Sequence, residues 1–196
     1  DDLIEAEKLK QQLSLSLLQQ QVNPHFLYNT LDNICALAEL DEKETLIQLV
    51  MNLSSFYRSS LSNGKMHISI GQELEISRAY LEILQIRYFH KFDFTITCPE
   101  ALKNYSCIKL LLQPILENSI YHGIKGLDRH GILHIEAEDT GDCIRFTISD
   151  NGRGFSKEDY EKIWQQDADH FGIKSIQQRI LLYYGPGYGL SITRSV

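Results

Sequence analysis

Two polar stretches in the second half of the chain place ligand-binding residue types in apolar or strand-like surroundings. Asn118 lies within the apolar run LLLQPILENSIYHGI, where an amide either holds a metal ion or makes a buried hydrogen bond. The stretch SDNGRGF occupies residues 149–155. Its Asp150 could accept a hydrogen bond from an exocyclic amine, and Gly152 and Gly154 would admit a ligand close to the backbone. The same DNGxG pattern is also typical of an ordinary turn.

A third stretch, FGIKSI, begins a helical pattern at Gly172. The free N–H groups at the start of that helix, together with Lys174, could receive a phosphate group. The alternative is an ordinary glycine at a helix start. Taken alone, each of the three stretches is therefore compatible with a purely structural role.

The first half of the chain contains QQQVNPHFLYNTLDN, which places Pro24 directly before His25 within a helical pattern. Proline lacks an N–H and clashes with the carbonyl of Gln20, so we expect a bent or loosened helix at a cost of about 3 kcal/mol. An imidazole is roughly half neutral near pH 6.5, and its neutral nitrogen could attack a phosphorus atom in line. The alternative is a true helix break with His25 as a surface residue.

The residues that position His25 follow a helical repeat. Apolar side chains recur every three or four residues over 1–40 and again over 46–61, and the charged segment 41–44 separates the two runs. We predict two helices that form an antiparallel hairpin. Because two helices cannot enclose a core, we expect a second copy of the chain to complete a four-helix bundle dimer.

A mixed pattern follows the turn-rich segment 61–65, which gives a predicted hairpin domain at 1–62 and a second domain at 63–196. Helical periodicity predicts helices at 70–88, 108–124 and 172–185, the first of them opened by a capping box at Ser69 and Gln72. Alternation predicts strands at 92–98, 131–139, 143–150 and 188–195. Helices on one face of an antiparallel or mixed sheet make an α+β sandwich.

Composition narrows the classes of function. The chain has 196 residues, a formal net charge of −7 and 43% hydrophobic residues. The net charge gives no general electrostatic reason to bind nucleic acid or an anionic membrane. No run of about 18 apolar residues could span a bilayer. The four cysteines are scattered without a CxxC pair, which is typical of free thiols in a reducing cytosol. Since the chain begins without Met, we expect it to be part of a longer protein.

The order of the three ligand-binding stretches resembles the N, G1 and G2 boxes of the ATP-binding fold shared by gyrase, Hsp90, histidine kinases and MutL. This is the GHKL or Bergerat fold. The resemblance implies that Asn118 holds Mg²⁺ against the phosphates of ATP. It also implies that Asp150 recognises the adenine amine, and that Gly152 and Gly154 make room for the nucleotide.

The same resemblance assigns residues 155–171 to a lid and places Gly172 and Lys174 near the phosphates. His122 lies one helical turn after Asn118 on the same face. It either touches phosphate or serves as a structural histidine. The G2 box commonly begins Gly-x-Gly, whereas this chain has His170 at the first glycine position.

The N box differs from that of the ATPases and the related anti-sigma serine kinases. Those proteins have an activating glutamate four residues before the asparagine, and this chain has Pro114 there. Glu117 points roughly 100° away from Asn118 around the helix and is not an obvious substitute. Water activation therefore lacks its usual base, and the resemblance implies a nucleophile supplied from elsewhere.

The segment NPHFLYNTL resembles the phosphoacceptor segment of bacterial sensor histidine kinases of the LytS and YesM type, and LLLQPILENSIYHGI resembles their N box. This match covers nearly the whole chain and implies that His25 is phosphorylated. Asn29, one turn later, would orient water or phosphate. Phe26 stands where many other histidine kinases have an acidic residue. The sheet is expected to lack the family's final strand, which would expose an edge.

The resemblance implies a function. The chain would be the cytoplasmic transmitter region of a two-component sensor kinase whose parent is membrane-anchored, with no nucleic-acid or membrane contact of its own. A homodimer would use Mg·ATP to phosphorylate His25 and would pass the phosphoryl group to an aspartate on a response regulator receiver domain. The alternatives are a dimeric nucleotide-binding pseudokinase or interaction module without phosphotransfer, and an ATPase, which Pro114 disfavours.

Overall fold

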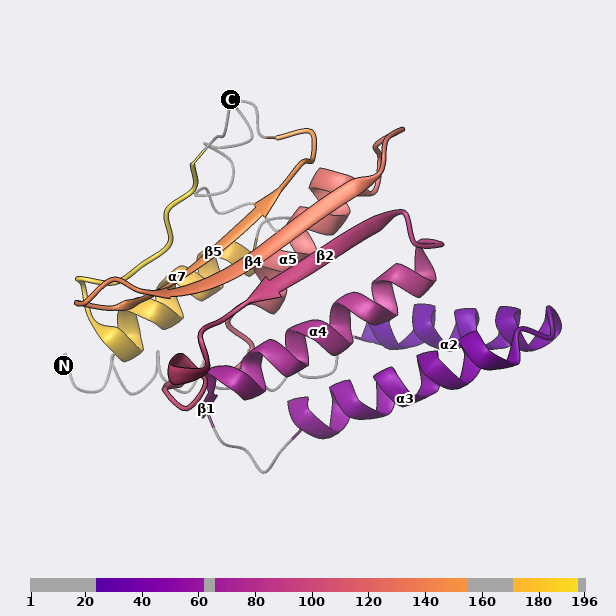
Figure 1. The fold of residues 1–196 in the computed structure, drawn as a ribbon, viewed down its shortest axis with the longest axis horizontal. Coiled ribbons are helices and arrows are strands. Elements are labelled where there is room, and N and C mark those ends of the chain that lie inside the picture. The colour runs from indigo at the N-terminus through magenta and orange to yellow at the C-terminus, as the bar shows by residue number, and fades with distance from the viewer. Residues whose placement is uncertain (1–23, 62–65, 155–170, 194–196) are drawn as a thin grey trace.

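The computed structural model describes residues 24–61, 66–154 and 171–193 (Figure 1). Its helices are α2 (Pro24–Glu39), α3 (Lys43–Ser60), α4 (Ile70–Arg87), the short 3-10 helix η1 (Glu100–Leu102), α5 (Gln113–Asn118), the π-helix η2 (Ser119–Ile124) and α7 (Phe171–Tyr184). Its strands are β1 (His67–Ser69), β2 (Phe92–Thr97), β3 (Ser106–Ile108), β4 (Gly131–Asp139) and β5 (Ile144–Asp150).

The predicted helical hairpin is present, with α2 and α3 side by side (Figure 1). The chain reverses at 40–42, where Asp41 adopts a positive φ of 59°. A short polar side chain such as aspartate tolerates this left-handed conformation better than most residues do. Residues 1–23 lie outside the described residues, so the bend before Pro24 stays a prediction.

One face of the hairpin is covered by α4 of the same chain, which the sequence did not lead us to expect. The buried positions of α2 and α3 point to α4, whereas positions two residues away, about 200° around each helix, stay exposed. The second face carries the exposed apolar side chains Tyr28, Leu31, Ile47, Val50 and Met51. A third helix therefore covers one apolar face of the hairpin and leaves the other exposed.

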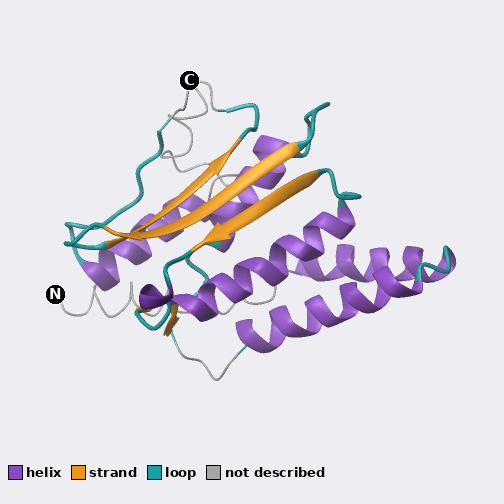
Figure 2. Cartoon of the chain, viewed as in Figure 1, coloured by secondary structure: helices purple, strands orange, loops and turns teal. Residues whose placement is uncertain are grey.

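The main sheet has the order β2-β4-β5, with β2 parallel to β4 and β4 antiparallel to β5. Along β4 every second side chain is buried, and this alternation means that the sheet has one inner face. Helices α4, α5 and α7 lie on that face (Figures 1 and 2). The predicted α+β sandwich is confirmed, and the hairpin packs outside it against α4.

Within the described residues, the first five residues of one predicted helix and one predicted strand are wrong. Residues 108–112 are not helical, because the backbone N–H groups of Leu110 and Leu112 donate to the Glu73 carboxylate instead. Residues 188–193 form no strand. There the N–H of Leu190 donates to the side-chain oxygen of Gln177 on α7, at 2.6 Å. The small antiparallel pair β1–β3 was not predicted at all.

Candidate functional site

The helix that carries Asn118 begins with α5 and continues as the π-helix η2. Pro114 lies in its first turn, where a missing N–H costs nothing. The Asn118 side chain donates from Nδ2 to the Pro114 carbonyl oxygen at 2.8 Å. Because the amide nitrogen is the donor, the amide oxygen is the atom that could serve a cation. Single π-helical turns recur at functional sites.

The DNGRG loop meets this helix at a point with no room for a side chain. Asp150 ends β5, and its Oδ1 accepts a hydrogen bond from the N–H of Gly152 at 2.9 Å. A Cβ on Gly152 would lie 2.5 Å from that oxygen and 2.7 Å from Cα of Gly123. A Cβ on Gly123 would lie 3.1 Å from the same oxygen. The two glycines therefore let the loop and the helix approach closely around the exposed Asp150.

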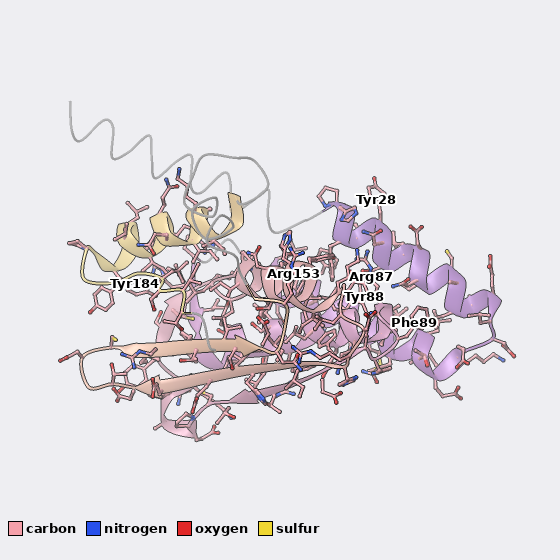
Figure 3. All side chains as sticks on the ribbon, turned by 90° about the horizontal axis from the view of Figure 1, so that it is seen from above. Tyr28, Arg87, Tyr88, Phe89, Arg153 and Tyr184 are labelled. Carbon is pink, nitrogen blue, oxygen red and sulfur yellow. The ribbon has the colours of Figure 1, made fainter. Side chains whose placement is uncertain are left out.

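Three further hydrogen bonds fix the loop in place. The N–H of Arg153 donates to the Gly123 carbonyl at 3.2 Å. Figure 3 shows Arg153 on the side of the sheet that carries the helices. The side chain of Asn151 accepts from the N–H of Ile132 at 2.7 Å and donates to the carbonyl of His130 at 3.2 Å. The loop position is thus set by β4 on one side and by η2 on the other.

Gly172 brings the start of α7 against the same helix. A Cβ on Gly172 would lie 3.3 Å from Cβ of Pro114, one turn before Asn118. Lys174 follows two residues later and is half-buried. Gly154 has a φ of +69° with no neighbour close to its Cβ position, so its backbone conformation rather than its space calls for glycine. His170 and most of the predicted lid, 155–170, lie outside the described residues.

Two buried charged side chains, Glu73 and Arg179, hold the backbone of the segment just before α5. Glu73 on α4 accepts from the N–H groups of Leu110 and Leu112 at 2.8 and 2.9 Å. Arg179 on α7 donates to the carbonyl oxygens of Leu110 and Lys109. Burial raises the pKa of the Glu73 carboxyl, and these backbone hydrogen bonds oppose the rise. Leu110 has a φ of +54°, a strained conformation that such clamping from two helices can maintain.

His25 is exposed on α2, and the buried side chain of the next residue, Phe26, fixes the orientation of this turn. The Phe26 side chain is 1% exposed, and its ring centroid lies 5.3 Å from that of Phe56 and 5.1 Å from that of Tyr80. Successive helical residues point about 100° apart, so burial of Phe26 holds His25 at the surface. Asn29 is half-buried, and its amide nitrogen has no hydrogen-bond partner among the residues described.

Tyr80 connects this aromatic cluster to the helix of Asn118. Its hydroxyl donates to Oε1 of Glu117 at 3.2 Å, and the side chain of Gln113 donates to the same oxygen at 3.1 Å. Burial raises the pKa of the Glu117 carboxyl, and the two hydrogen bonds oppose the rise. Glu117 therefore faces α4 rather than the Asn118 side, as the 100° offset predicted.

Further along the same face, cations and aromatic rings join α4 to η2. Arg87 donates to the hydroxyl of Tyr121 at 3.2 Å, and Lys125 lies over the rings of Tyr88 and Tyr121 at 5.9 and 5.7 Å. Burial raises the pKa of Tyr88 to about 12. In Figure 3, Arg87 and Tyr88 lie between the strands and Tyr28 of α2. These contacts hold the helix by one face and leave the exposed His122 on another.

The structure places Asp150, Gly152 and Gly172, three of the residues singled out by sequence, against the helix that carries Asn118. His25 lies outside this cluster and is linked to it through Phe26, Tyr80 and Glu117. Among the described residues, no group of His, Cys, Asp and Glu side chains forms a ready metal site. Within the same residues, no helix is long and apolar enough to cross a membrane.

Sequence reasoning missed several residues that build the site. Gly123 is the closest neighbour of the DNGRG loop. Nothing in the sequence indicated this contact beyond the presence of a glycine directly after His122. Glu73 and Arg179 each gave a signal, namely a charged residue at an inward position of an apolar helical pattern. Tyr80 gave none, because a tyrosine in a helical apolar stripe is compatible with any core.

Comparison with known proteins gives two family models that match successive parts of the chain. The model described as histidine kinase matches residues 13–92, across the predicted domain boundary. The model described as histidine kinase-, DNA gyrase B-, and HSP90-like ATPase matches residues 105–196.

Individual relatives match over most of the chain. Sensor histidine kinase YesM of Bacillus subtilis is 31% identical over 192 residues, which is 98% of this chain and 33% of the relative. Sensor histidine kinase BtsS of Escherichia coli is 33% identical over 92% of this chain and 31% of its own length. Sensor histidine kinase/phosphatase LytS of Staphylococcus aureus is 32% identical over 80% of this chain and 28% of its own length. The chain thus spans about a third of the length of these relatives.

Proposed function

The chain belongs to the bacterial sensor histidine kinases, and from that premise we propose that it is the transmitter region of such a kinase. In this proposal the sandwich binds Mg·ATP, the γ-phosphoryl group moves to His25, and it then passes to an aspartate of a response regulator receiver domain. Family membership supports the class of reaction. The geometry of the described residues supports the assignment of roles.

The main support for the proposed nucleotide site is that two of the three motifs contact the helix that contains the third. Asp150 and Gly152 meet Gly123, and Gly172 meets Pro114, so Asn118 lies between the two loops along that helix. The glycines let both loops pack closely against this helix, which keeps the exposed Asp150 carboxylate beside it for a bound nucleotide. We assign the adenine amine to the carboxylate of Asp150 and Mg²⁺ to the amide oxygen of Asn118. Mg²⁺ supplies charge neutralisation for the phosphates.

The remaining assignments complete the nucleotide site. Gly154 gives the loop a backbone conformation that few other residues adopt, and we assign it to the nucleotide side of the loop. Lys174 and the first N–H groups of α7 would receive phosphate oxygens. His122, exposed one turn after Asn118, would add a donor there.

His25 is the proposed acceptor because it is an exposed imidazole held by a rigid anchor. Its neutral ring nitrogen would form the new N–P bond while the bond between the γ-phosphorus and the β-γ bridging oxygen of ATP breaks and ADP leaves. The imidazole loses its N–H proton to solvent or buffer in the process. Asn29, on the same face of α2 one turn later, would orient the transferred group or a water molecule.

The exposed apolar face of the hairpin supports the proposed homodimer. A second hairpin on that face would give a four-helix bundle, with α4 of each chain packed outside it. The predicted boundary at 62–63 would then separate the dimerisation and phosphotransfer hairpin from the ATP-binding domain. The relatives are named as sensors, which supports a membrane-anchored parent with this region on the cytoplasmic side.

The second candidate is a dimeric nucleotide-binding module without phosphotransfer. The observation that favours it is the absence of a strand at 188–193, which leaves β5 unpaired on its outer side among the described residues. This candidate predicts that the protein binds ATP and never becomes labelled.

Incubation with [γ-³²P]ATP and Mg²⁺ tests the proposal. We expect acid-labile, base-stable label that is lost in His25→Gln. The matched control is His134→Gln, since His134 is exposed on the outer face of the sheet and should keep full label. Label that persists in His25→Gln would contradict the assignment. Binding of ATP without label in the wild-type chain would favour the second candidate.

A further inference from the structure

Tyr80 touches both the phosphoacceptor hairpin and the nucleotide helix. Its side chain is fully buried in the middle of α4. One side of its ring lies in the cluster with Phe26 and Phe56, with centroid distances of 5.1 and 5.8 Å. Its hydroxyl reaches the Glu117 carboxylate at 3.2 Å. A single side chain thus bridges α2 and α3 on one side and α5 on the other.

The hydroxyl end of this bridge is well defined. Burial raises the pKa of Tyr80 well above its ordinary value, so the phenol stays protonated and donates at neutral pH. Gln113 donates to the same oxygen of Glu117 at 3.1 Å, which fixes the carboxylate from a second direction. Glu117 directly precedes Asn118 on α5, so a movement of one moves the other.

The ring end is equally constrained. Phe26 follows His25 directly, and its carbonyl oxygen accepts a hydrogen bond from the Thr30 hydroxyl at 2.7 Å. The turn that presents His25 therefore moves together with the Phe26 ring. Because close-packed rings have little free space, displacing Phe26 displaces the ring of Tyr80.

Packing alone does not explain why this residue is tyrosine. A phenylalanine would fill the same space without burying a hydroxyl, and a buried hydroxyl costs free energy unless it is hydrogen-bonded. Tyr57 provides a contrast in the same cluster, since its ring lies 5.3 Å from that of Phe56. The Tyr57 hydroxyl is buried without a hydrogen-bond partner in the described part of the chain.

We propose that Tyr80 is a positioning residue that couples the turn bearing His25 to the helix bearing Asn118. The inference rests on the proposed function, because it concerns the alignment of the acceptor with the nucleotide. Phe26 carries the position of the acceptor turn to the Tyr80 ring, and the Tyr80–Glu117 hydrogen bond carries it to Asn118. Nucleotide binding itself depends on other groups, chiefly Asp150 and the glycines, and does not require this bond.

The first test is Tyr80→Phe, which keeps the ring and removes the hydroxyl. We expect kcat for labelling of His25 to fall about tenfold, while KM for ATP stays within about twofold of the wild-type value. Tyr57→Phe is the matched control, because it removes a hydroxyl from the same cluster without breaking a bond. It should leave both constants within about twofold. Circular dichroism and urea unfolding confirm that both variants fold.

A double-mutant cycle separates coupling from a general loss of packing. If Tyr80 acts through Glu117, Tyr80→Phe combined with Glu117→Met, which removes the acceptor oxygen, should label no more slowly than the slower single variant, within about twofold. Fully additive losses would overturn the proposal, as would an unchanged kcat in Tyr80→Phe or an equal loss in Tyr57→Phe. A wild-type chain without label, or label that remains in His25→Gln, would instead overturn the proposed function and leave ATP binding to be explained separately.

Discussion

Gly152→Ala should weaken nucleotide binding more than any other glycine-to-alanine change in the described chain. The new Cβ would lie 2.5 Å from Oδ1 of Asp150 and 2.7 Å from Cα of Gly123, well inside normal contact distances. Overpacking of this kind costs about 1–3 kcal/mol. The neighbour that can yield is the Asp150 carboxylate, because Gly123 is backbone within a helix. The strain should therefore displace the group to which we assign the adenine amine.

Since each 1.4 kcal/mol is a factor of ten, this strain corresponds to an affinity for ATP about 5- to 140-fold weaker. Titration with a fluorescent ATP analogue measures the effect directly. Gly126→Ala is the matched control: it lies three residues after Gly123, and its Cβ position has no neighbour within 4 Å. That variant should bind as the wild type does. Wild-type affinity in a folded Gly152→Ala protein would refute the assignment of this loop to the nucleotide.

Three further outcomes are expected. Phe26→Ala should lower the free energy of unfolding by about 3–5 kcal/mol in urea titrations, because it removes one of the three packed rings of Phe26, Phe56 and Tyr80. A loss below about 1 kcal/mol would mean that Phe26 does not hold α2 in place. Burial raises the pKa of Tyr88 from 10 to about 12, so between these pH values the folded state keeps a proton that the unfolded state loses. The free energy of unfolding should therefore fall as pH rises from 10 to 12, and it should fall less steeply in Tyr88→Phe. The same dependence of stability on pH in both proteins would contradict the assigned pKa. Val50→Glu, on the exposed face of α3, should convert a dimer to a folded monomer in sedimentation experiments, and an unchanged dimer would place the interface elsewhere.

Elements specified by nearby residues could be predicted from the sequence. Helix α4 starts where Ser69 and Gln72 form both bonds of a capping box, and these residues are three apart in the chain. Strands β4 and β5 alternate strictly, and a short turn joins them. In each case the information that determines the element lies within it or beside it.

Elements specified by distant side chains could not be predicted. Residues 108–112 have a helical apolar pattern, but Glu73, 37 residues before Leu110, takes the backbone N–H groups. Residues 188–193 have a strand pattern, but Gln177 takes the N–H of Leu190. In both segments a side chain from another helix competes with regular backbone pairing, and no local pattern records that partner.

The residues of the candidate site also fall into those that a local motif marks and those that only distant contacts mark. Asn118, Asp150, Gly152 and Gly172 could be singled out because each stands in a short recognisable motif. Gly123 and Tyr80 were missed because their importance depends on which segments meet in space. The role of Tyr80 as a link between the helix of His25 and the helix of Asn118 is visible only once Phe26 and Glu117 are seen on its two sides.

We expect a nucleotide held beside Asn118 and Asp150 to phosphorylate the exposed imidazole of His25. Mass-spectrometric peptide mapping at alkaline pH, after incubation of the chain with Mg·ATP, tests it most directly. We expect a phosphoryl group on His25 that is absent when the same experiment uses Asp150→Asn. A phosphoryl group on another residue, or one on His25 that persists undiminished in Asp150→Asn, would contradict it.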